Sequence, residues 1–198
     1  MIKHKQIQEE RMRGYFIAAT TALLKGEGLR SISVRNVADR AGYSSATLYH
    51  YFKDVKDLIL VCVTDFLQEG RQFIDAEIGN VAPGIDRIRA VTAAYLKYFI
   101  QYPGIFDLFF LEKITDLAHR QPTVSMITGF LDTLCAADWE YCIRQQIVSA
   151  ADSDKIRKTL KFVTAGLLIY YLNRREPVDY SDFNILVREQ LQQILPAS

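Results

Sequence analysis

A glycine between two short helical patterns is the feature that most limits the fold of this chain. The patterns cover residues 33–41 and 44–50, and Ala41-Gly42-Tyr43-Ser44 joins them. Two short helices joined in this way have the length and composition of a helix-turn-helix. Gly42 supplies the backbone freedom that a sharp turn requires. The sequence therefore predicts a helix-turn-helix.

Capping residues and two flanking helices support this motif. Ser33 fits the N-cap of the first short helix, Ser44 or Ser45 that of the second, and Asp54 that of a helix from Val55 to about 78. A preceding helix, ended by two glycines at positions 26 and 28, carries an amphipathic stripe. The stripe consists of Met12, Tyr15, Phe16, Ala19, Ala22 and Leu23.

Helical periodicity continues through the remainder of the 198 residues, and no alternating strand pattern of useful length appears. Prolines and glycines divide the pattern into segments, including a tight corner at Pro103-Gly104 and one long helix from Pro122 to about Val148. We expect an all-α protein of about nine helices. Residues 10–70 form an N-terminal domain with the motif at 33–52, and residues 71–198 form a second helical domain.

Composition excludes several classes of protein. No apolar run reaches the roughly 18 residues of a membrane helix, and the first residues lead into no apolar signal sequence. The three cysteines are odd in number and show no CxxC spacing, which favours reduced thiols over disulfides or a zinc site. We therefore expect a cytoplasmic protein without membrane, metal or cofactor.

The N-terminal domain has the charge and side chains of a DNA-binding surface. Residues 1–60 hold ten basic and six acidic residues, whereas the remainder holds fourteen and seventeen. The second short helix would offer hydroxyl and planar side chains to a groove, and lysines follow it. The plainer interpretation is that the hydroxyls only cap helices and the aromatic rings only pack, as we expect for Leu48 and Phe52.

At this point the sequence resembles the TetR family of bacterial regulators. The match lies in residues 31–54, SISVRNVADRAGYSSATLYHYFKD, preceded at the expected distance by an apolar helix. The resemblance implies phosphate or base contacts for Ser33, Arg35, Ser44, Ser45, Thr47, Tyr49 and His50. Two positions depart from the family pattern: Tyr51 replaces a histidine, and Val55 replaces a lysine. We hypothesise that Lys53 or Lys56 compensates.

Aromatic residues are concentrated in residues 91–142, and the resemblance implies a ligand cavity there. The expected lining is Tyr95, Tyr98, Phe99, Phe106, Phe109, Phe110, Phe130 and Trp139. Such a pocket would suit an apolar or aromatic compound, and nearby Glu112, Asp116 and Asp138 could favour a cationic one. The alternative is that these aromatic side chains form an ordinary core.

The last two predicted helices cover about 155–173 and 182–195. The resemblance implies that they pair across a homodimer as a four-helix bundle. The candidate interface residues are Leu160, Val163, Leu167, Tyr170, Tyr171, Leu186 and Leu191. A two-fold DNA site requires a two-fold protein, which favours this interpretation over packing within one chain alone.

These observations together predict a ligand-responsive repressor. A homodimer would bind a near-palindromic operator, with its two recognition helices separated by the roughly 34–36 Å that successive major grooves require. A small apolar or aromatic effector would change this separation and so release the protein from the operator. One alternative is a redox-responsive regulator, although Cys135 and Cys142 lie about 10 Å apart on one helix. A helical enzyme is less favoured, because no catalytic or metal-binding residue set appears. A scaffold without DNA affinity is a third alternative.

Overall fold

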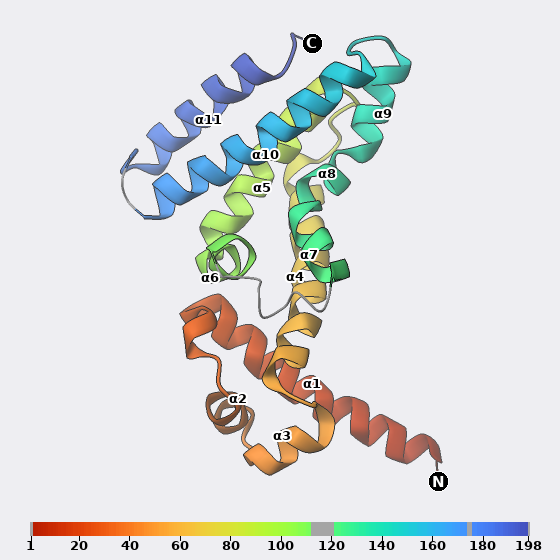
Figure 1. The fold of residues 1–198 in the computed structure, drawn as a ribbon, viewed down its shortest axis with the longest axis vertical. Helices are drawn as coiled ribbons and strands as arrows, with labels where there is room; N and C mark the ends of the chain where they lie inside the picture. Colours follow the sequence, from red (N-terminus) through yellow and green to blue (C-terminus); the bar gives the residue numbers. More distant parts are fainter. Residues whose placement is uncertain (1, 112–120, 174–175, 198) are drawn as a thin grey trace. The chain divides into compact units, whose positions relative to one another are not determined.

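The chain forms an all-α fold, as the sequence predicts. The computed structural model describes residues 2–111, 121–173 and 176–197, and these contain eleven α-helices and no strand (Figure 1). The helices are α1 (Ile2–Glu27), α2 (Val34–Ala41), α3 (Ser45–Tyr51), α4 (Val55–Ile78), α5 (Ile85–Gln101), α6 (Pro103–Phe106), α7 (Gln121–Thr128), α8 (Phe130–Leu134), α9 (Ala136–Arg144), α10 (Ala150–Leu172) and α11 (Tyr180–Ile194). A 3₁₀-helix, η1 (Leu29–Ser31), and a short π-helix, η2 (Asp107–Leu111), complete the described elements.

The chain divides into two compact units. The head unit consists of residues 1–68 and 102–127, and the body unit of residues 69–101 and 128–198. Helix α4 contributes its first part to the head unit and its last part to the body unit. No helix in the described part of the chain has the length and apolar character that a membrane span requires.

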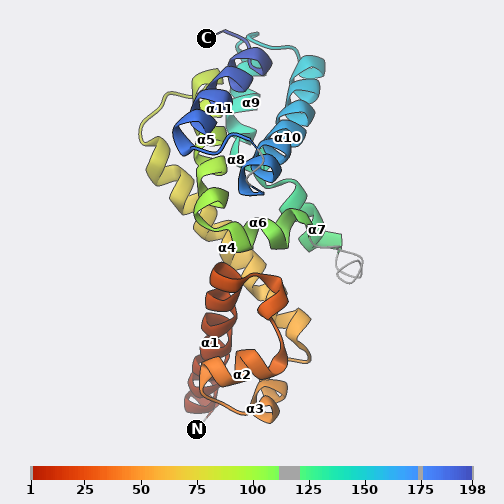
Figure 2. The same cartoon turned by 90° about the vertical axis from the view of Figure 1, so that its left-hand side faces the viewer.

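The head unit is built around α1, which α2 and α3 contact near its middle (Figure 2). Its core contains Phe16, Leu48, Phe52 and Leu58, all almost completely buried. Tyr15 was predicted to lie on the buried stripe of α1, but its side chain is exposed and contacts the ring of Tyr43 instead. The apolar stripe of α1 is thus narrower than the sequence pattern indicates.

A second contact in the head unit joins α6 to the end of α1 through Gly104. A Cβ atom at Gly104 would overlap with the carbonyl oxygen of Leu24, and it would lie 3.2 Å from the Leu24 carbonyl carbon and 3.3 Å from the Lys25 carbonyl oxygen. Pro103 occupies the first turn of α6, as its fixed φ allows. The predicted corner at Pro103-Gly104 is therefore also a site where two backbones approach closely.

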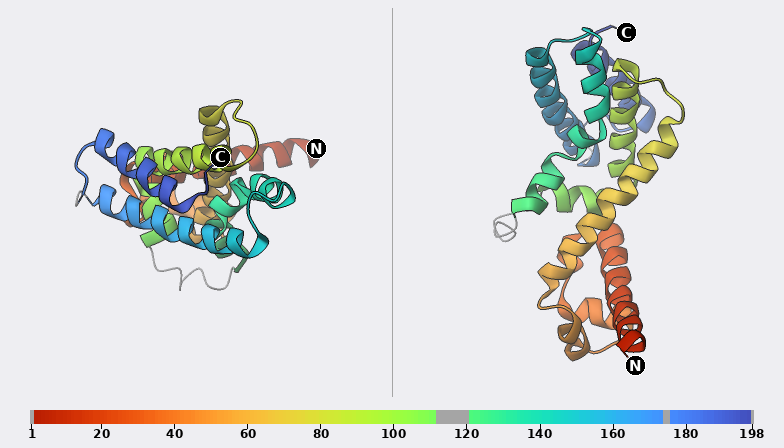
Figure 3. Two further views of the ribbon diagram at one scale, coloured as in Figure 1. Left: turned by 90° about the horizontal axis from the view of Figure 1, so that it is seen from above. Right: turned by 90° about the vertical axis from the view of Figure 1, so that its right-hand side faces the viewer.

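In the body unit α5 packs against both α9 and α10, and α11 lies along α10 (Figures 1 and 3). Aromatic rings fill the space beside α4, where Gly70 leaves room for them. A Cβ atom at Gly70 would lie 3.1 Å from ring atoms of both Tyr98 and Phe130. The absence of a side chain at this position thus allows the aromatic residues of α5 and α8 to pack close to α4.

Three helix boundaries differ from those predicted. The predicted long helix from Pro122 to Val148 is divided into α7, α8 and α9, with breaks at Gly129 and Cys135. Glycine weakens a helix interior, which accounts for the first break; Cys135 has no helix-breaking chemistry. Helix α10 begins at Ala150, earlier than the predicted 155, because Ser149 caps it by accepting the N–H of Asp152 at 3.0 Å.

Asp138, one of the acids considered for ligand binding, has a structural role in the body unit. Its carboxylate accepts the backbone N–H of Gly84 at 3.2 Å and lies 3.4 Å from Nε of Arg87. Burial raises the pKa of Asp138, with these two partners opposing the shift. The carboxylate therefore joins α9 to the start of α5. Glu112 and Asp116 lie outside the described residues.

Candidate nucleic-acid interface

The turn between α2 and α3 has the geometry that the sequence predicts. Gly42 adopts φ 78° and ψ 26°, a left-handed conformation that strains any residue with a Cβ atom. Its N–H donates to the carbonyl of Asp39 at 3.1 Å, and the N–H of Tyr43 donates to that of Ala38 at 3.0 Å. These bonds satisfy two of the last four carbonyls of α2 and fix the path of the chain between α2 and α3.

Serine hydroxyls cap both short helices. Oγ of Ser33 accepts the N–H of Asn36 at 3.1 Å, and Oγ of Ser44 accepts the N–H of Thr47 at 3.1 Å. The hydroxyls of Ser44 and Thr47 also lie 2.9 Å apart, so one of them donates to the other. Asp54 caps α4 by accepting the N–H of Asp57 at 2.8 Å. All three predicted caps are confirmed.

Helix α3 has one buried and one exposed face. Leu48 is completely buried and holds the helix against the head core. Away from this buried face, Tyr49 is 56% exposed, and the neighbouring His50 is also exposed. Ser45 and Thr47 are half-buried. The outer face of α3 therefore presents an aromatic ring, an imidazole and hydroxyl groups to the surroundings.

Three of the predicted DNA-binding residues are cationic. Arg35 on α2 and the two lysines at positions 53 and 56 are exposed. The Arg35 guanidinium lies 3.7 Å from the Asp39 carboxylate, and both side chains are well exposed. Because exposed ion pairs contribute at most about 1 kcal/mol, Arg35 can exchange Asp39 for a phosphate at little cost.

The two departures from the family pattern lie at the edge of the head core. Tyr51 and Val55 are half-buried and pack against this core. The carbonyl of Tyr51 accepts a hydrogen bond from the Arg13 guanidinium, whose central carbon lies 4.2 Å from the centroid of the Phe52 ring. These contacts give Tyr51 and Val55 a packing role. The cations nearest to these two positions in sequence are then the lysines at positions 53 and 56.

Sequence reasoning did not include Tyr43 among the site residues. Its ring contacts those of Tyr15 and Phe16, with centroids 6.0 and 5.6 Å away, while 36% of the residue remains exposed beside the turn. The Gly42-Tyr43 pair was available as a signal, since the segments that connect helices generally lie at the protein surface.

The aromatic residues predicted to line one pocket divide between the two units. Five of them belong to the body unit, where all are buried: Tyr95, Tyr98, Phe99, Phe130 and Trp139. The other three belong to the head unit, where Phe106 and Phe109 are buried and Phe110 is half-buried. Within each unit the rings contact one another, at 4.9 Å between Tyr95 and Phe99 and 5.1 Å between Phe106 and Phe110.

The predicted dimer residues differ widely in exposure. Leu160 and Leu191 are buried against their own chain, so they have almost no surface to offer a second copy. Tyr170 is 54% exposed, and the others are half-buried: Val163, Leu167, Tyr171 and Leu186. Phe162, which sequence reasoning omitted, is the most exposed aromatic side chain on α10, at 72%.

The three cysteines are buried, and burial raises the pKa of each thiol, to about 12 for Cys135 and about 11 for Cys62. Since the thiolate is the reactive form, these values argue against the redox alternative. No group of three potential metal ligands occurs among the residues that the structure describes.

Comparisons with known proteins agree with this geometry. Residues 16–62 match the family described as "Bacterial regulatory proteins, tetR family". A putative TetR-family transcriptional regulator from Rhodococcus sp. is similar in structure, with a TM-score of 0.74 and 16% identity over 93% of this chain and 98% of that one. FadR from Bacillus subtilis, solved in complex with stearoyl-CoA, has a TM-score of 0.71 and 15% identity over 91% and 96% of the two chains.

A TetR-family regulator from Marinobacter aquaeolei VT8 has a TM-score of 0.66 and 16% identity over 96% of this chain and 98% of that one. These identities are low, so the structural matches establish the fold, and the match over residues 16–62 concerns the helix-turn-helix itself. Residues 16–62 therefore match the TetR-family helix-turn-helix domain, and the fold of the chain is similar to the folds of solved TetR-family regulators.

Proposed function

We propose that this chain is a transcriptional repressor that binds a near-palindromic DNA operator as a homodimer and releases it when a small apolar or aromatic effector binds. The observation that carries the proposal is the construction of α3. Leu48 anchors one face in the core, and the other face presents Tyr49 and His50 at the surface. A helix held in this way can enter a major groove with its outer side chains against base edges.

The roles of the remaining residues follow from their chemistry. Ser44, Ser45 and Thr47 offer hydroxyls at the start of α3, and each hydroxyl can contact a base edge or a phosphate. Ser33, Arg35 and the two lysines at positions 53 and 56 are assigned to phosphates, as is the hydroxyl of Tyr43.

DNA binding is tested by measuring affinity for duplex DNA as a function of salt concentration. Each lysine that contacts a phosphate contributes nearly one unit to the slope of log K against log salt. We expect the double variant Lys53→Ala, Lys56→Ala to reduce the slope by up to two units. The matched control is Lys155→Ala, Lys158→Ala, which removes two exposed lysines of α10. An unchanged slope in the first variant, or an equal change in the control, would contradict the assignment.

The proposed dimer rests on an apolar surface formed by α10 and α11. Phe162 and Tyr170 are eight residues apart on α10, hence on one face, and Gly166 lies between them with open space around it. Ile185 on α11 is also exposed. Exposed apolar residues in such a group are typical of protein interfaces. Phe162 and Ile185 thus replace the buried Leu160 and Leu191 as candidate contacts.

Sedimentation velocity tests this surface. We expect the wild type to be a dimer at micromolar concentration and Phe162→Glu to shift it toward monomer, because a carboxylate would be buried without a partner. Ile7→Glu places the same charge at an exposed apolar position of α1 and should leave the dimer intact. A monomeric wild type, or a dimeric Phe162→Glu variant, would count against the interface.

Effector binding is tested by thermal unfolding and DNA release with the same compounds. A ligand that binds the folded protein raises Tm. A ligand that binds the DNA-free protein more tightly than the DNA-bound protein weakens DNA binding by the ratio of these two affinities. Since FadR from Bacillus subtilis was solved with stearoyl-CoA, long-chain acyl thioesters are the first compounds to test, followed by aromatic compounds. The proposal of an inducible repressor fails if compounds that raise Tm leave DNA affinity unchanged.

A further inference from the structure

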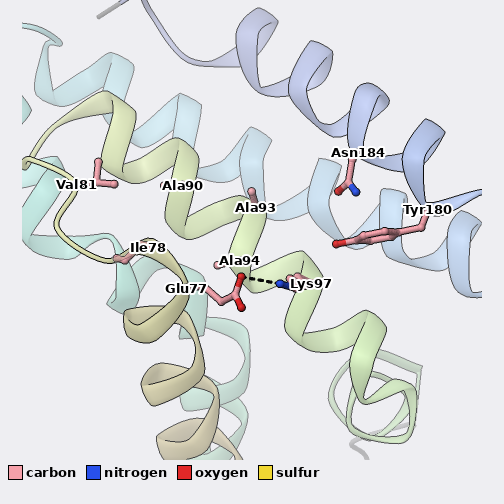
Figure 4. Close-up of a pocket in the computed structure, with 9 residues that line it drawn as sticks. All are labelled: Glu77, Ile78, Val81, Ala90, Ala93, Ala94, Lys97, Tyr180 and Asn184. Atoms are coloured by element: carbon pink, nitrogen blue, oxygen red, sulfur yellow. Dashed lines mark hydrogen bonds and ion pairs between the residues drawn. The ribbon is translucent and has the colours of Figure 1, made fainter.

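A pocket of about 340 Å³ lies on the surface of the body unit, formed by the end of α4, one face of α5 and the start of α11 (Figure 4). Its floor consists of Ala90, Ala93 and Ala94 on α5, and Tyr180 on α11 forms one wall. The small alanine side chains create the hollow. None of the aromatic residues predicted to bind an effector lines this pocket, so it is a different site.

An ion pair lies within the pocket. Nζ of Lys97 on α5 is 2.7 Å from Oε2 of Glu77 on α4. Each side chain remains partly exposed, at 44% and 37%, so both can also contact a ligand. The hydrogen bond that Lys97 donates to Glu77 raises the pKa of Lys97, which favours its charged ammonium form. Figure 4 shows Asn184 and Tyr180 across the pocket from this pair.

The ion pair restricts the chemistry of a ligand. An anion that approached Lys97 would be repelled by Glu77, and a cation that approached Glu77 would be repelled by Lys97. An uncharged apolar molecule would cover both charges and remove their water without replacing it. A molecule with adjacent positive and negative groups gives each charge a partner, and an apolar substituent can then cover the alanine floor.

We propose that this pocket binds a free α-amino acid with an apolar or aromatic side chain. Its carboxylate binds Nζ of Lys97, its ammonium group binds the carboxylate of Glu77, and its side chain packs on Ala93 beside the Tyr180 ring. The amide of Asn184 can donate to the carboxylate or accept from the ammonium group. The volume agrees with this class, because it is near the lower end of the roughly 300–1,000 Å³ of ligand pockets.

Isothermal titration calorimetry of the full chain with L-phenylalanine tests the proposal. The experiment is done without DNA, so that the result does not depend on whether the protein binds an operator. Titration extends to about 10 mM, since a small open pocket is expected to bind in the millimolar range. We expect one molecule per chain. Two analogues isolate the charges, because 3-phenylpropionate lacks the ammonium group and phenethylamine lacks the carboxylate. Each should bind at least roughly tenfold more weakly than phenylalanine.

Variants locate the binding. Ala93→Leu fills the pocket, and Lys97→Met removes the carboxylate partner from a half-exposed position; each should reduce affinity at least roughly tenfold. The control Ala137→Leu makes the same alanine-to-leucine substitution at an exposed position of α9 outside the pocket. This variant should bind phenylalanine as tightly as the wild type does. The proposal is overturned if phenylalanine does not bind, if either analogue binds equally well, or if both pocket variants keep wild-type affinity.

Discussion

Replacing Gly104 with alanine should destabilise the protein, although alanine is the better helix former. The added methyl group would overlap with the carbonyl oxygen of Leu24 and lie 3.2 Å from its carbonyl carbon. The obstacle is the backbone of α1, which cannot rotate away as a side chain can. That oxygen also accepts the N–H of Gly28 at 3.2 Å, so displacing it weakens the end of α1.

The expected cost follows from these contacts. Overpacking of a well-packed site costs about 1–3 kcal/mol, and a clash with backbone belongs at the upper end. The gain in helix propensity is at most about 1 kcal/mol. We therefore expect a net loss of about 2 kcal/mol, which corresponds to a Tm lower by about 4–8 °C in a chain of this length.

Thermal unfolding followed by circular dichroism measures this effect, with Gly14→Ala as the matched control. Gly14 lies inside α1 with nothing within 4 Å of an added Cβ atom. The same substitution should there raise Tm by a few degrees, up to about 1 kcal/mol of added stability. A Gly104→Ala variant as stable as the wild type would refute the claim that α1 and α6 meet without room for a methyl group.

Three further predictions concern single side chains. Ser44→Ala removes the cap of α3 and should lower the stability of the protein by about 1 kcal/mol. Ser44→Asp should keep the cap but weaken DNA binding, because its carboxylate repels phosphate. If the wild type and both variants were equally stable in thermal unfolding, the capping role would be contradicted. Because burial raises the thiol pKa of Cys62 and Cys135 to about 11 and about 12, both should react with a thiol reagent at pH 8 far more slowly in the native than in the denatured protein, and fast native labelling would contradict their burial. Burial also raises the pKa of Asp138 above the roughly 3.9 of an unfolded chain, so the folded state retains its proton more strongly and stability falls as pH rises from about 4 through the raised pKa. Asp138→Asn stays uncharged and should lose this part of the pH dependence of Tm; parallel curves for the two proteins would contradict it.

The sequence predicted those features of the head unit that depend on neighbouring residues. Ser33, Ser44 and Asp54 cap helices by bonds to residues three positions away, and Gly42 adopts its left-handed conformation within a single turn. Such preferences act locally, so they can be recognised without knowing the rest of the fold. The bounds of α4, 55 to 78, were predicted for the same reason.

Features that depend on distant residues could not be predicted. The contact of Gly104 with Leu24 joins positions eighty residues apart, and the sequence showed only a turn at the glycine. Periodicity alone also could not assign Leu160 to the core and Phe162 to the surface, because both lie on one helix whose apolar residues surround much of its circumference. The eight aromatic residues predicted to form one cluster belong to two units for a similar reason, since nearness in sequence does not determine packing.

The close packing of aromatic rings at Gly70 restricts which substitutions this sequence can accept during evolution. A Cβ atom at that position would lie 3.1 Å from both the Tyr98 and the Phe130 ring, closer than ordinary van der Waals contact. The rings would have to shift, so we expect the three positions not to vary independently. A smaller residue at 130 would tolerate alanine at 70, whereas alanine at 70 alone would be selected against. In sequences that descend from a common ancestor with this chain, ring size at 130 and the presence of a side chain at 70 should therefore covary.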